Sequence, residues 1–464
     1  MMRTMSASFP AIPPSLSAPL DPDFAPCALW NRDYLRSVKS TGNGVPLVIA
    51  LEGEDGRVSR YETWISADPD AAGLRYAERI VKMLLWARGG WRVIIGGPLA
   101  VAAHVRGLYA KGSVRAFDAE MMERIYLQPF TVEHSASDAV PDSLERGIAQ
   151  GGHLDGCRIG FDLGASDYKL AAVKEGDVVW SHEIPWDPKN QADPDYHYRH
   201  LSAGLKEAAS HLPRVDAIGG SSAGVIVNNR FMVASLLRSV PEEKFEEARN
   251  LFVRLQREWN IPLEVANDGD VTALAGAMSL GENGVLGIAM GSSKAVGCID
   301  PQGRITGWLN ELAFAPVDMN DAAPADEWSG DRGVGSLYFS QQAVNKLLPA
   351  AGISLPAEMN LPERLKEVQK LMAAGDERAL RIHETIGTYL GYSVAHYADF
   401  YDFRHLLILG RVTTGEGGDI ILNRAKEVSA AAFPELAARI NMQLPDEKSR
   451  RVGQAVAAAS LPKR

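Results

Sequence analysis

Short apolar runs that end beside a small or polar residue recur along the latter two thirds of this chain. Residues 158–163, 217–220, 263–266 and 406–409 are such runs, and glycine, serine or asparagine follows each of them directly. Runs of this length predict buried strands. Helical spacing of apolar side chains lies between them, most clearly over residues 242–260, which predict one amphipathic helix. Strands that alternate with helices predict an α/β fold.

The region before residue 157 has a different organisation. Six prolines interrupt the first 27 residues, which contain no continuous apolar segment and do not resemble a secretory signal. We therefore predict a flexible Pro-rich arm over residues 1–44. Residues 45–135 predict an accessory α/β unit that opens with a β-hairpin of residues 47–51 and 58–65. Its short span of large apolar side chains should pack against the rest of the protein. Residues 136–156 are polar and glycine-rich, and predict a linker.

Composition excludes several classes of protein. The chain has 58 acidic and 48 basic residues, a net charge of −10, which disfavours a nucleic-acid partner. No segment has the roughly 18–20 apolar residues of a membrane helix, so no membrane partner is expected. The three cysteines, Cys27, Cys157 and Cys298, are far apart and form no CxxC pair. This pattern disfavours a disulfide scaffold and a zinc cluster, and favours a reducing, cytoplasmic location.

The first candidate functional segment is the turn after the strand of residues 158–163. Glycine at Gly164 would let backbone amides approach a phosphate, while Ser166 adds a hydroxyl and Lys169 a positive charge. Asp162 could hold Mg²⁺ through its water shell. A tight β-turn with solvated polar side chains explains the same residues equally well.

The second candidate is the pair Asn267 and Asp268, at the end of a buried strand and directly before a helix. A carboxylate in this place suits a general base that accepts a proton from a hydroxyl. The structural alternative is a helix cap, formed by Asp268 or Asp270. Because Asp270 could serve as the cap, both interpretations are compatible.

Two further turns carry weaker signals. Residues 291–294 (Gly-Ser-Ser-Lys) join two predicted strands and could cradle a phosphate or form a plain hairpin turn. Gly410 follows the strand of residues 406–409 and precedes a glycine-rich turn and a helix. Helix N-termini favour anions, but glycine at such a turn is also ordinary packing.

In this order, the segments resemble the ROK family (repressors, open reading frames, sugar kinases) of the actin-like sugar-kinase superfamily. The resemblance covers residues 157 to about 460. Residues 162–169 resemble the family's first phosphate motif, D-x-G-x-[TS]-x-x-K, and residues 265–268 the segment whose aspartate is the catalytic base. Residues 309–314 are similar to a sugar-contacting segment, and residues 406–412 to the adenosine motif.

The resemblance implies a fold, a set of cofactors and a set of site residues. The expected fold is α/β, with two actin-like (ribonuclease H-like) lobes around a cleft in residues 157–464. The expected cofactors are ATP and Mg²⁺. The implied roles are a catalytic base at Asp268, substrate contacts from Asn267, Asp268 and Glu311, a water-mediated Mg²⁺ contact from Asp162, and nucleotide contacts from Asp162, Gly164, Ser166, Lys169, Gly291, Ser292, Ser293 and Gly410.

Several positions depart from the family pattern. Ser329 and Val334 stand where the family's zinc motif has cysteines, so no zinc is expected. Phe314 replaces a sugar-contacting histidine, and Ser336 replaces a sugar-contacting glutamate. The second phosphate loop lacks its glycine run and has Lys294 instead.

Together these features predict ATP-dependent phosphorylation of a hydroxyl on a sugar or sugar derivative, with a small-molecule sugar as partner and a homodimer allowed. The alternative is a non-catalytic, ROK-like sensor of sugar or nucleotide without DNA binding, since the family includes repressors. The retained Asp268 and first phosphate motif favour the enzyme.

Overall fold

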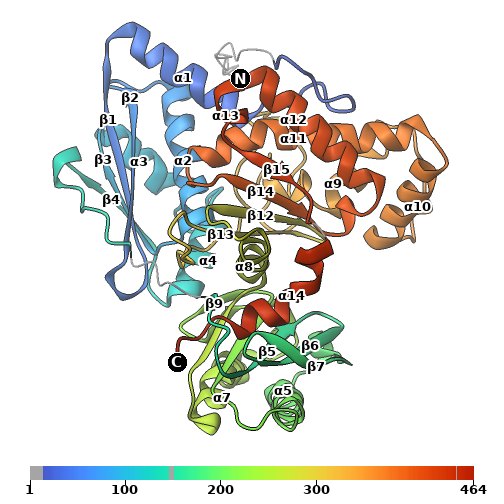
Figure 1. The fold of residues 1–464 in the computed structure, drawn as a ribbon. Helices are drawn as coiled ribbons and strands as arrows, with labels where there is room; N and C mark the ends of the chain where they lie inside the picture. The colour runs from blue at the N-terminus through green and yellow to red at the C-terminus, as the bar shows by residue number, and fades with distance from the viewer. Residues whose placement is uncertain (1–13, 146–150, 446) are drawn as a thin grey trace.

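Apolar strands dictate the layout of the protein, which is described here by a computed structural model. The structure describes residues 14–145, 151–445 and 447–464. An N-terminal unit lies beside two lobes, with helix α8 between the lobes (Figure 1). The N-terminal unit contains α1 (Cys27–Thr41), β1 (Gly44–Glu52), β2 (Val58–Ser66), α2 (Ala71–Arg88), β3 (Arg92–Gly96), α3 (Leu99–Leu108), α4 (Ala116–Tyr126) and β4 (Thr131–Ser135).

The first lobe is built on a mixed sheet with the strand order β11-β8-β5-β6-β7. Strands β5, β8 and β11 run parallel, and β6 and β7 continue as an antiparallel meander. Its elements are β5 (Cys157–Leu163), β6 (Asp167–Lys174), β7 (Asp177–Pro185), α5 (Pro194–Ala209), β8 (Ala217–Ser222), β9 (Val225–Val227), β10 (Arg230–Val233), α6 (Phe245–Arg249), α7 (Leu251–Trp259), β11 (Leu263–Asn267) and, from the end of the chain, α14 (Glu447–Ala459).

The second lobe is built on a sheet with the order β13-β12-β14-β15, in which β12, β14 and β15 are parallel and β13 is antiparallel. Its elements are α8 (Asp268–Leu280), β12 (Val285–Met290), β13 (Lys294–Ile299), α9 (Gln341–Leu347), α10 (Leu361–Ala373), α11 (Glu377–Ala398), β14 (His405–Leu409), α12 (Glu416–Ala432), α13 (Pro434–Ala437) and β15 (Asn441–Gln443). Among the described residues, no helix is long and apolar enough to cross a membrane.

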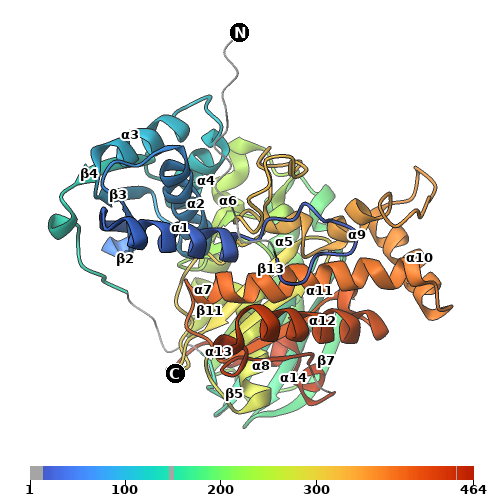
Figure 2. The ribbon, with the colours of Figure 1, turned by 90° about the horizontal axis from the view of Figure 1, so that it is seen from above.

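The prediction of a flexible arm over residues 1–44 is wrong for the part of it that the structure describes. Residues 27–41 form α1, which meets the C-terminal end of α11, where Arg32 pairs with Asp399 at 2.8 Å (Figure 2). Phe24, Trp30 and Tyr34 are buried, and the Phe24 ring meets the edge of Tyr389 with 4.7 Å between centroids. The prolines that precede this helix suggested an irregular segment. Proline disrupts the interior of a helix but is tolerated at its start, and Pro26 directly precedes α1. Residues 1–13 of the predicted arm lie outside the described residues.

The N-terminal unit shares one hydrophobic core with the second lobe. Leu47, Leu84 and Trp86 belong to the same cluster of buried side chains as Ile386 and Ile408. The predicted hairpin is confirmed as the antiparallel pair β1–β2. The expectation that residues 45–135 pack against the rest of the protein is also confirmed. In the predicted linker, Val140 is buried and Leu144 bridges to Val58, while residues 146–150 lie outside the described residues.

One predicted helix is divided. Residues 242–260 were expected to form a single helix, but the helical backbone breaks at Asn250, between α6 and α7. The Asn250 side chain donates to the backbone carbonyl of Glu246 over 2.8 Å. Asparagine side chains compete in this way with the helical hydrogen-bond ladder.

Candidate active site

The parallel strands of the first lobe bring three segments to one edge of its sheet. In register, Asp162 of β5 lies beside Ser221 of β8, which lies beside Ala266 of β11. The next residues of β11 and α8 are Asn267 and Asp268. Because the carboxyl ends of parallel strands meet at the same edge, residues far apart in the sequence become neighbours there.

Asp268 is the first residue of α8 and is half-buried. Burial, and next the negative charge of Asp162, raise the pKa of Asp268 to about 6. The preceding Asn267 caps the helix, since its Oδ1 accepts from the Gly269 amide over 2.8 Å. The Asn267 Nδ2 donates to the Gly224 carbonyl over 2.8 Å. The end of β11 and the turn at Gly224, between β8 and β9, therefore hold the start of α8, and Asp268 with it.

Asp270 does not cap the helix, so the capping alternative is wrong for this residue. It is buried, and its Oδ1 accepts from the Cys298 amide at 3.3 Å and from Asn310 Nδ2 at 2.9 Å. Burial is the main cause that raises the pKa of Asp270 to about 7. Asp270 therefore ties α8 to β13 and to the loop that contains Asn310.

The turn between β5 and β6 is tight. The Gly164 amide donates to the Asp167 carbonyl over 3.0 Å, and Ser166 Oγ donates to the Asp167 carboxylate over 2.9 Å. Lys169 is exposed and lies opposite Asp162 across the β5–β6 pair. Burial raises the pKa of the Asp162 carboxyl, and the nearby Lys169 partly opposes this shift.

The second lobe presents a corresponding edge. Ala289 of β12 lies beside Leu409 of β14, so both strands end together, at Gly291 and Gly410. Gly410 has a φ of 102°, and a Cβ on it would lie 2.6 Å from the Met290 carbonyl oxygen. Only glycine fits here without strain. In the 291–293 turn, the Gly291 amide donates to the Ser293 carbonyl over 3.0 Å, and Ser292 and Ser293 are exposed.

Lys294 does not contribute a charge to this turn. Its side chain is buried, and Nζ donates to the Tyr397 hydroxyl over 2.6 Å. Burial lowers the pKa of Lys294 well below its ordinary value. A phosphate near the turn would therefore depend on backbone amides and on the hydroxyls of Ser292 and Ser293.

A first cavity of about 580 Å³ lies at the start of α8. Asp268, Gly269 and Thr272 line it on one side, and Gly410 and Thr414 on the other. Of the residues predicted from the sequence, it brings together Asp268 and Gly410. It does not include Asp162, Gly164, Ser166, Lys169, Gly291, Ser292 or Ser293, which lie outside its lining.

A second cavity of about 600 Å³ lies on the other side of the same helix start. Asn267 and Asp270 line it, together with residues 225–229 of the first lobe and residues 305–309 of the second. The N-terminal unit contributes Glu54, Asp55, Arg57 and Tyr126. Sequence reasoning missed these four residues. Glu54, Asp55 and Arg57 lie in or beside a hairpin turn, Tyr126 ends a helix, and no motif marks any of them as part of a site.

No protein-family model matches the sequence, and no curated protein matches it at the sequence level. Solved structures do match. The ROK hexokinase from Thermus thermophilus matches with a TM-score of 0.51 and 17% identity, over 65% of this chain and 97% of that one. A ROK family transcriptional regulator, a homologue of the E. coli MLC protein, matches with a TM-score of 0.51 and 17% identity, over 66% of this chain and 79% of that one.

The chain has the ROK fold. The prediction of an α/β fold with two actin-like lobes is thereby confirmed. The hexokinase is matched almost completely by about two thirds of this chain, so about a third of the chain has no counterpart in it. Residues 157–464, which form the two lobes, make up about two thirds of the sequence. The two lobes are therefore of the size of the matched part of this chain.

Two residues of the segment that resembles a sugar-contacting motif contact the N-terminal unit. Phe314 packs against Trp86 of α2, with 4.5 Å between ring centroids, and against Phe117 of α4. The Glu311 amide donates to the Trp86 carbonyl over 2.9 Å. Glu311 lines neither cavity, but burial, followed by the charges of Asp268 and Asp270, raises its pKa to about 8.

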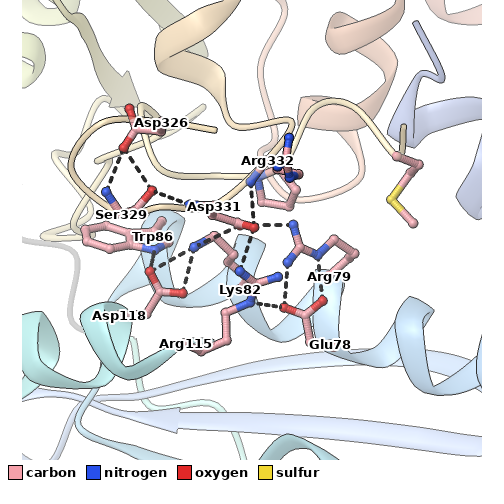
Figure 3. Close-up of polar contacts among 12 residues, drawn as sticks. Glu78, Arg79, Lys82, Trp86, Arg115, Asp118, Asp326, Ser329, Asp331 and Arg332 are labelled. Atoms are coloured by element: carbon pink, nitrogen blue, oxygen red, sulfur yellow. Dashed lines mark hydrogen bonds and ion pairs between the residues drawn. The ribbon is translucent and has the colours of Figure 1, made fainter. Parts of the chain in front are cut away.

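A buried ion-pair network lies at the segment around Asp331, where the sequence departs from the expected zinc motif (Figure 3). Asp331 pairs with Arg79 at 3.1 Å, with Lys82 at 3.2 Å and with Arg115 at 2.6 Å. Lys82 also pairs with Asp118 at 2.7 Å. These cations and Asp118 come from α2, α4 and the residue before α4, so charge pairs fasten this loop of the ROK fold to the N-terminal unit.

Proposed function

We propose that the protein transfers a phosphoryl group from ATP to a hydroxyl of a sugar or sugar derivative. The observation that carries this proposal is the pair of cavities on either side of the start of α8. Asp268 lines one, while Asn267 and Asp270 line the other. Each has the volume usual for small-molecule sites, roughly 300–1,000 Å³. The cavity with Gly410 would take the nucleotide, and the other the acceptor.

Asp268 has the properties required of the base. With a pKa of about 6, its carboxylate is mostly ionised at neutral pH and still able to accept a proton. Asp268 lines the nucleotide cavity and its neighbour Asn267 lines the acceptor cavity, so closure of the lobes would have to bring the acceptor hydroxyl to Asp268. That hydroxyl would then give its proton to Asp268 as its oxygen bonds to the γ-phosphorus. The bond from that phosphorus to the bridging oxygen breaks, and ADP leaves. Positioning and charge neutralisation supply most of the catalysis in such transfers.

Asp162 is the residue that would hold Mg²⁺, through water. The described residues include no group of three or more His, Cys, Asp or Glu side chains arranged around a metal, so phosphate oxygens would supply further ligands. Asp162 fits this role because its carboxylate lies close enough to Asp268 to raise the pKa of that residue. When bound, Mg²⁺ neutralises charge on the phosphates.

The turns at the two sheet edges would hold the phosphates. Gly164, Ser166 and Lys169 lie at the edge that bears Asp162, and Gly291, Ser292 and Ser293 at the edge that bears Gly410. Neither turn lines the first cavity, so closure of the lobes would have to bring them to the phosphates. Closure would also exclude water and limit hydrolysis of ATP.

The test is ADP release from ATP and Mg²⁺ with a panel of hexoses, N-acetyl sugars and polyols. On an accepted sugar, Asp268→Asn should reduce turnover by about 10²- to 10⁴-fold. Nucleotide binding, measured as the thermal shift with ADP, should persist. Asp177→Asn, an exposed aspartate in β7, is the matched control and should keep normal turnover. Normal turnover in Asp268→Asn would refute the role of this residue.

A non-catalytic sensor is the second candidate. It is favoured by Lys294, which points into the core where a phosphate loop could use a charge, and by the structural likeness to a ROK regulator. A sensor would bind sugar or nucleotide without releasing ADP on any member of the panel. A sugar partner, a cytoplasmic location, a homodimer and the absence of nucleic acid and zinc remain predictions that accompany the enzyme proposal.

A further inference from the structure

The second cavity has a wall that the two lobes do not supply. Glu54 and Asp55 lie in a single 3₁₀ turn, residues 54–56, between β1 and β2, and Tyr126 is the last residue of α4. Together with Arg57 they face residues 225–229 of the first lobe and residues 305–309 of the second across the cavity. A pocket formed by the lobes alone would be open on this side.

Hydrogen bonds fix this wall in place. Arg57 donates from one terminal nitrogen to the Arg88 carbonyl over 3.0 Å and from the other to the Gly307 carbonyl. The Gly53 amide donates to the Arg57 carbonyl over 2.8 Å, which closes the turn. The turn is therefore hydrogen-bonded to α2 and to the second lobe. A turn held in this way would keep its position when a ligand binds.

Glu54, on the N-terminal side of the cavity, also contacts the first lobe. Asn228 Nδ2 donates to Glu54 Oε1 over 3.0 Å. Asn228 adjoins Asn229, whose side chain bonds to the Leu263 carbonyl and the Val265 amide of β11 at 2.8 Å each. Strand β11 leads directly to Asn267 and Asp268. Glu54 is thus connected through two residues to the strand that positions the proposed base.

The charges of the cavity are unbalanced. Glu54, Asp55, Glu264 and Asp270 line it, whereas Arg57 is the only Lys or Arg in the lining. Both terminal nitrogens of Arg57 already donate to carbonyls. Ionised carboxylates accept hydrogen bonds and repel anions. A ligand with hydroxyl or ammonium donors would satisfy them, whereas an anion would be repelled.

We infer that the N-terminal unit completes the acceptor pocket through Glu54 and Tyr126, and that it restricts the acceptor to sugars without a negative charge. This inference rests on the proposed function, because it identifies the second cavity as the acceptor site. It assigns Glu54 and Glu264 as specificity-determining residues. Sugar acids and sugar phosphates should be excluded, and neutral or amino sugars accepted.

The test compares matched probes with and without nucleotide. Binding of glucose, glucosamine and glucuronate is measured by calorimetry on the full chain, and turnover of each by ADP release. The wild-type protein should prefer glucose or glucosamine to glucuronate by at least about tenfold. Glu54→Gln and Glu264→Gln keep the side-chain shape, and each should reduce that preference severalfold while leaving ADP binding unchanged. Glu120→Gln, at an exposed position of α4, is the control and should not alter the preference.

The outcomes separate this inference from the proposed function. If sugars bind with the expected preference but no ADP is released, the kinase proposal fails and the inference about the pocket stands. If sugars are phosphorylated but glucuronate is used as well as glucose, the inference fails alone. It also fails if Glu54→Gln and Glu264→Gln retain the wild-type preference while their melting temperatures show that they are folded.

Discussion

The Asn310 side chain donates a hydrogen bond of 2.9 Å to the Asp270 carboxylate, and this bond joins the loop that carries Glu311 to the helix that begins with Asp268. The backbone of the same loop is held by the N-terminal unit, since the Asn310 amide donates to the Ala87 carbonyl over 2.9 Å. Hydrogen bonds of Asn310 therefore connect its loop to α8 and to α2 of the N-terminal unit, close to the proposed base.

Asp270 should influence stability in a pH-dependent way. Its pKa in the folded protein is about 7, above the ordinary value of 3.8, so the folded state binds the proton more tightly than the unfolded state. The wild-type free energy of unfolding should therefore be largest below pH 4 on this account and fall as the pH rises toward 7. Asp270→Asn should remove this dependence and should be at least as stable as the wild type at pH 8.

Asp270→Ala is the contrasting variant. It leaves the Cys298 amide and the Asn310 side chain without their acceptor, which should cost about 1–3 kcal/mol. Urea unfolding at pH 5 and pH 8 measures both variants. A large loss of stability in Asp270→Asn at pH 8 would contradict the argument.

The dependence of kcat/KM on pH on the acidic side should reflect the ionisation of Asp268. On an accepted sugar, kcat/KM should rise with pH through a midpoint near 6, as Asp268 loses its proton. Asp162→Asn removes a like charge next to Asp268, so the midpoint should move to lower pH even though the rate itself falls. An unchanged midpoint would show that Asp268 is not the group that titrates.

Gly410 should tolerate no side chain. Gly410→Ala adds a Cβ that would lie 2.6 Å from the Met290 carbonyl oxygen, whereas a Cβ on Gly415, which also has a positive φ, meets no atom within 4 Å. Both substitutions carry backbone strain of about 1–3 kcal/mol. Gly410→Ala should be the less stable of the two, and it alone should weaken ADP binding. Urea unfolding and ADP titration check this; equal effects of both variants would contradict it.

The buried pair of Lys82 and Asp118 should behave as a coupled unit. Lys82 is fully buried, so Lys82→Met leaves Asp118 without its cation and should cost about 3–5 kcal/mol. The double variant Lys82→Met, Asp118→Asn removes both charges and should be more stable than Lys82→Met alone. Lys370→Met breaks an exposed pair with Glu367 and should cost at most about 1 kcal/mol. Chemical denaturation of the four proteins checks this, and a double variant no more stable than Lys82→Met would contradict it.

Local patterns were sufficient for much of the framework. The β1–β2 hairpin, strand β5 and the strand that leads to Asn267 followed from apolar runs and turn residues, because these signals act over a few residues. The same patterns pointed to Asp162, Asp268 and Gly410. The structure places Asp162 near Asp268, and it places Asp268 and Gly410 on one cavity. Their roles in catalysis remain predictions.

The sequence by itself therefore determined several of the strands and the carboxylates at their ends. Only the tertiary structure decided that residues 27–41 form a helix in the core, that Lys294 points inward and that Asp270 bonds to Asn310 instead of capping its helix. It also decided that Glu54 and Asn267 line the same cavity. These relationships join residues that are distant along the chain, and they arise because burial of a shared core brings such segments together, which no local periodicity encodes.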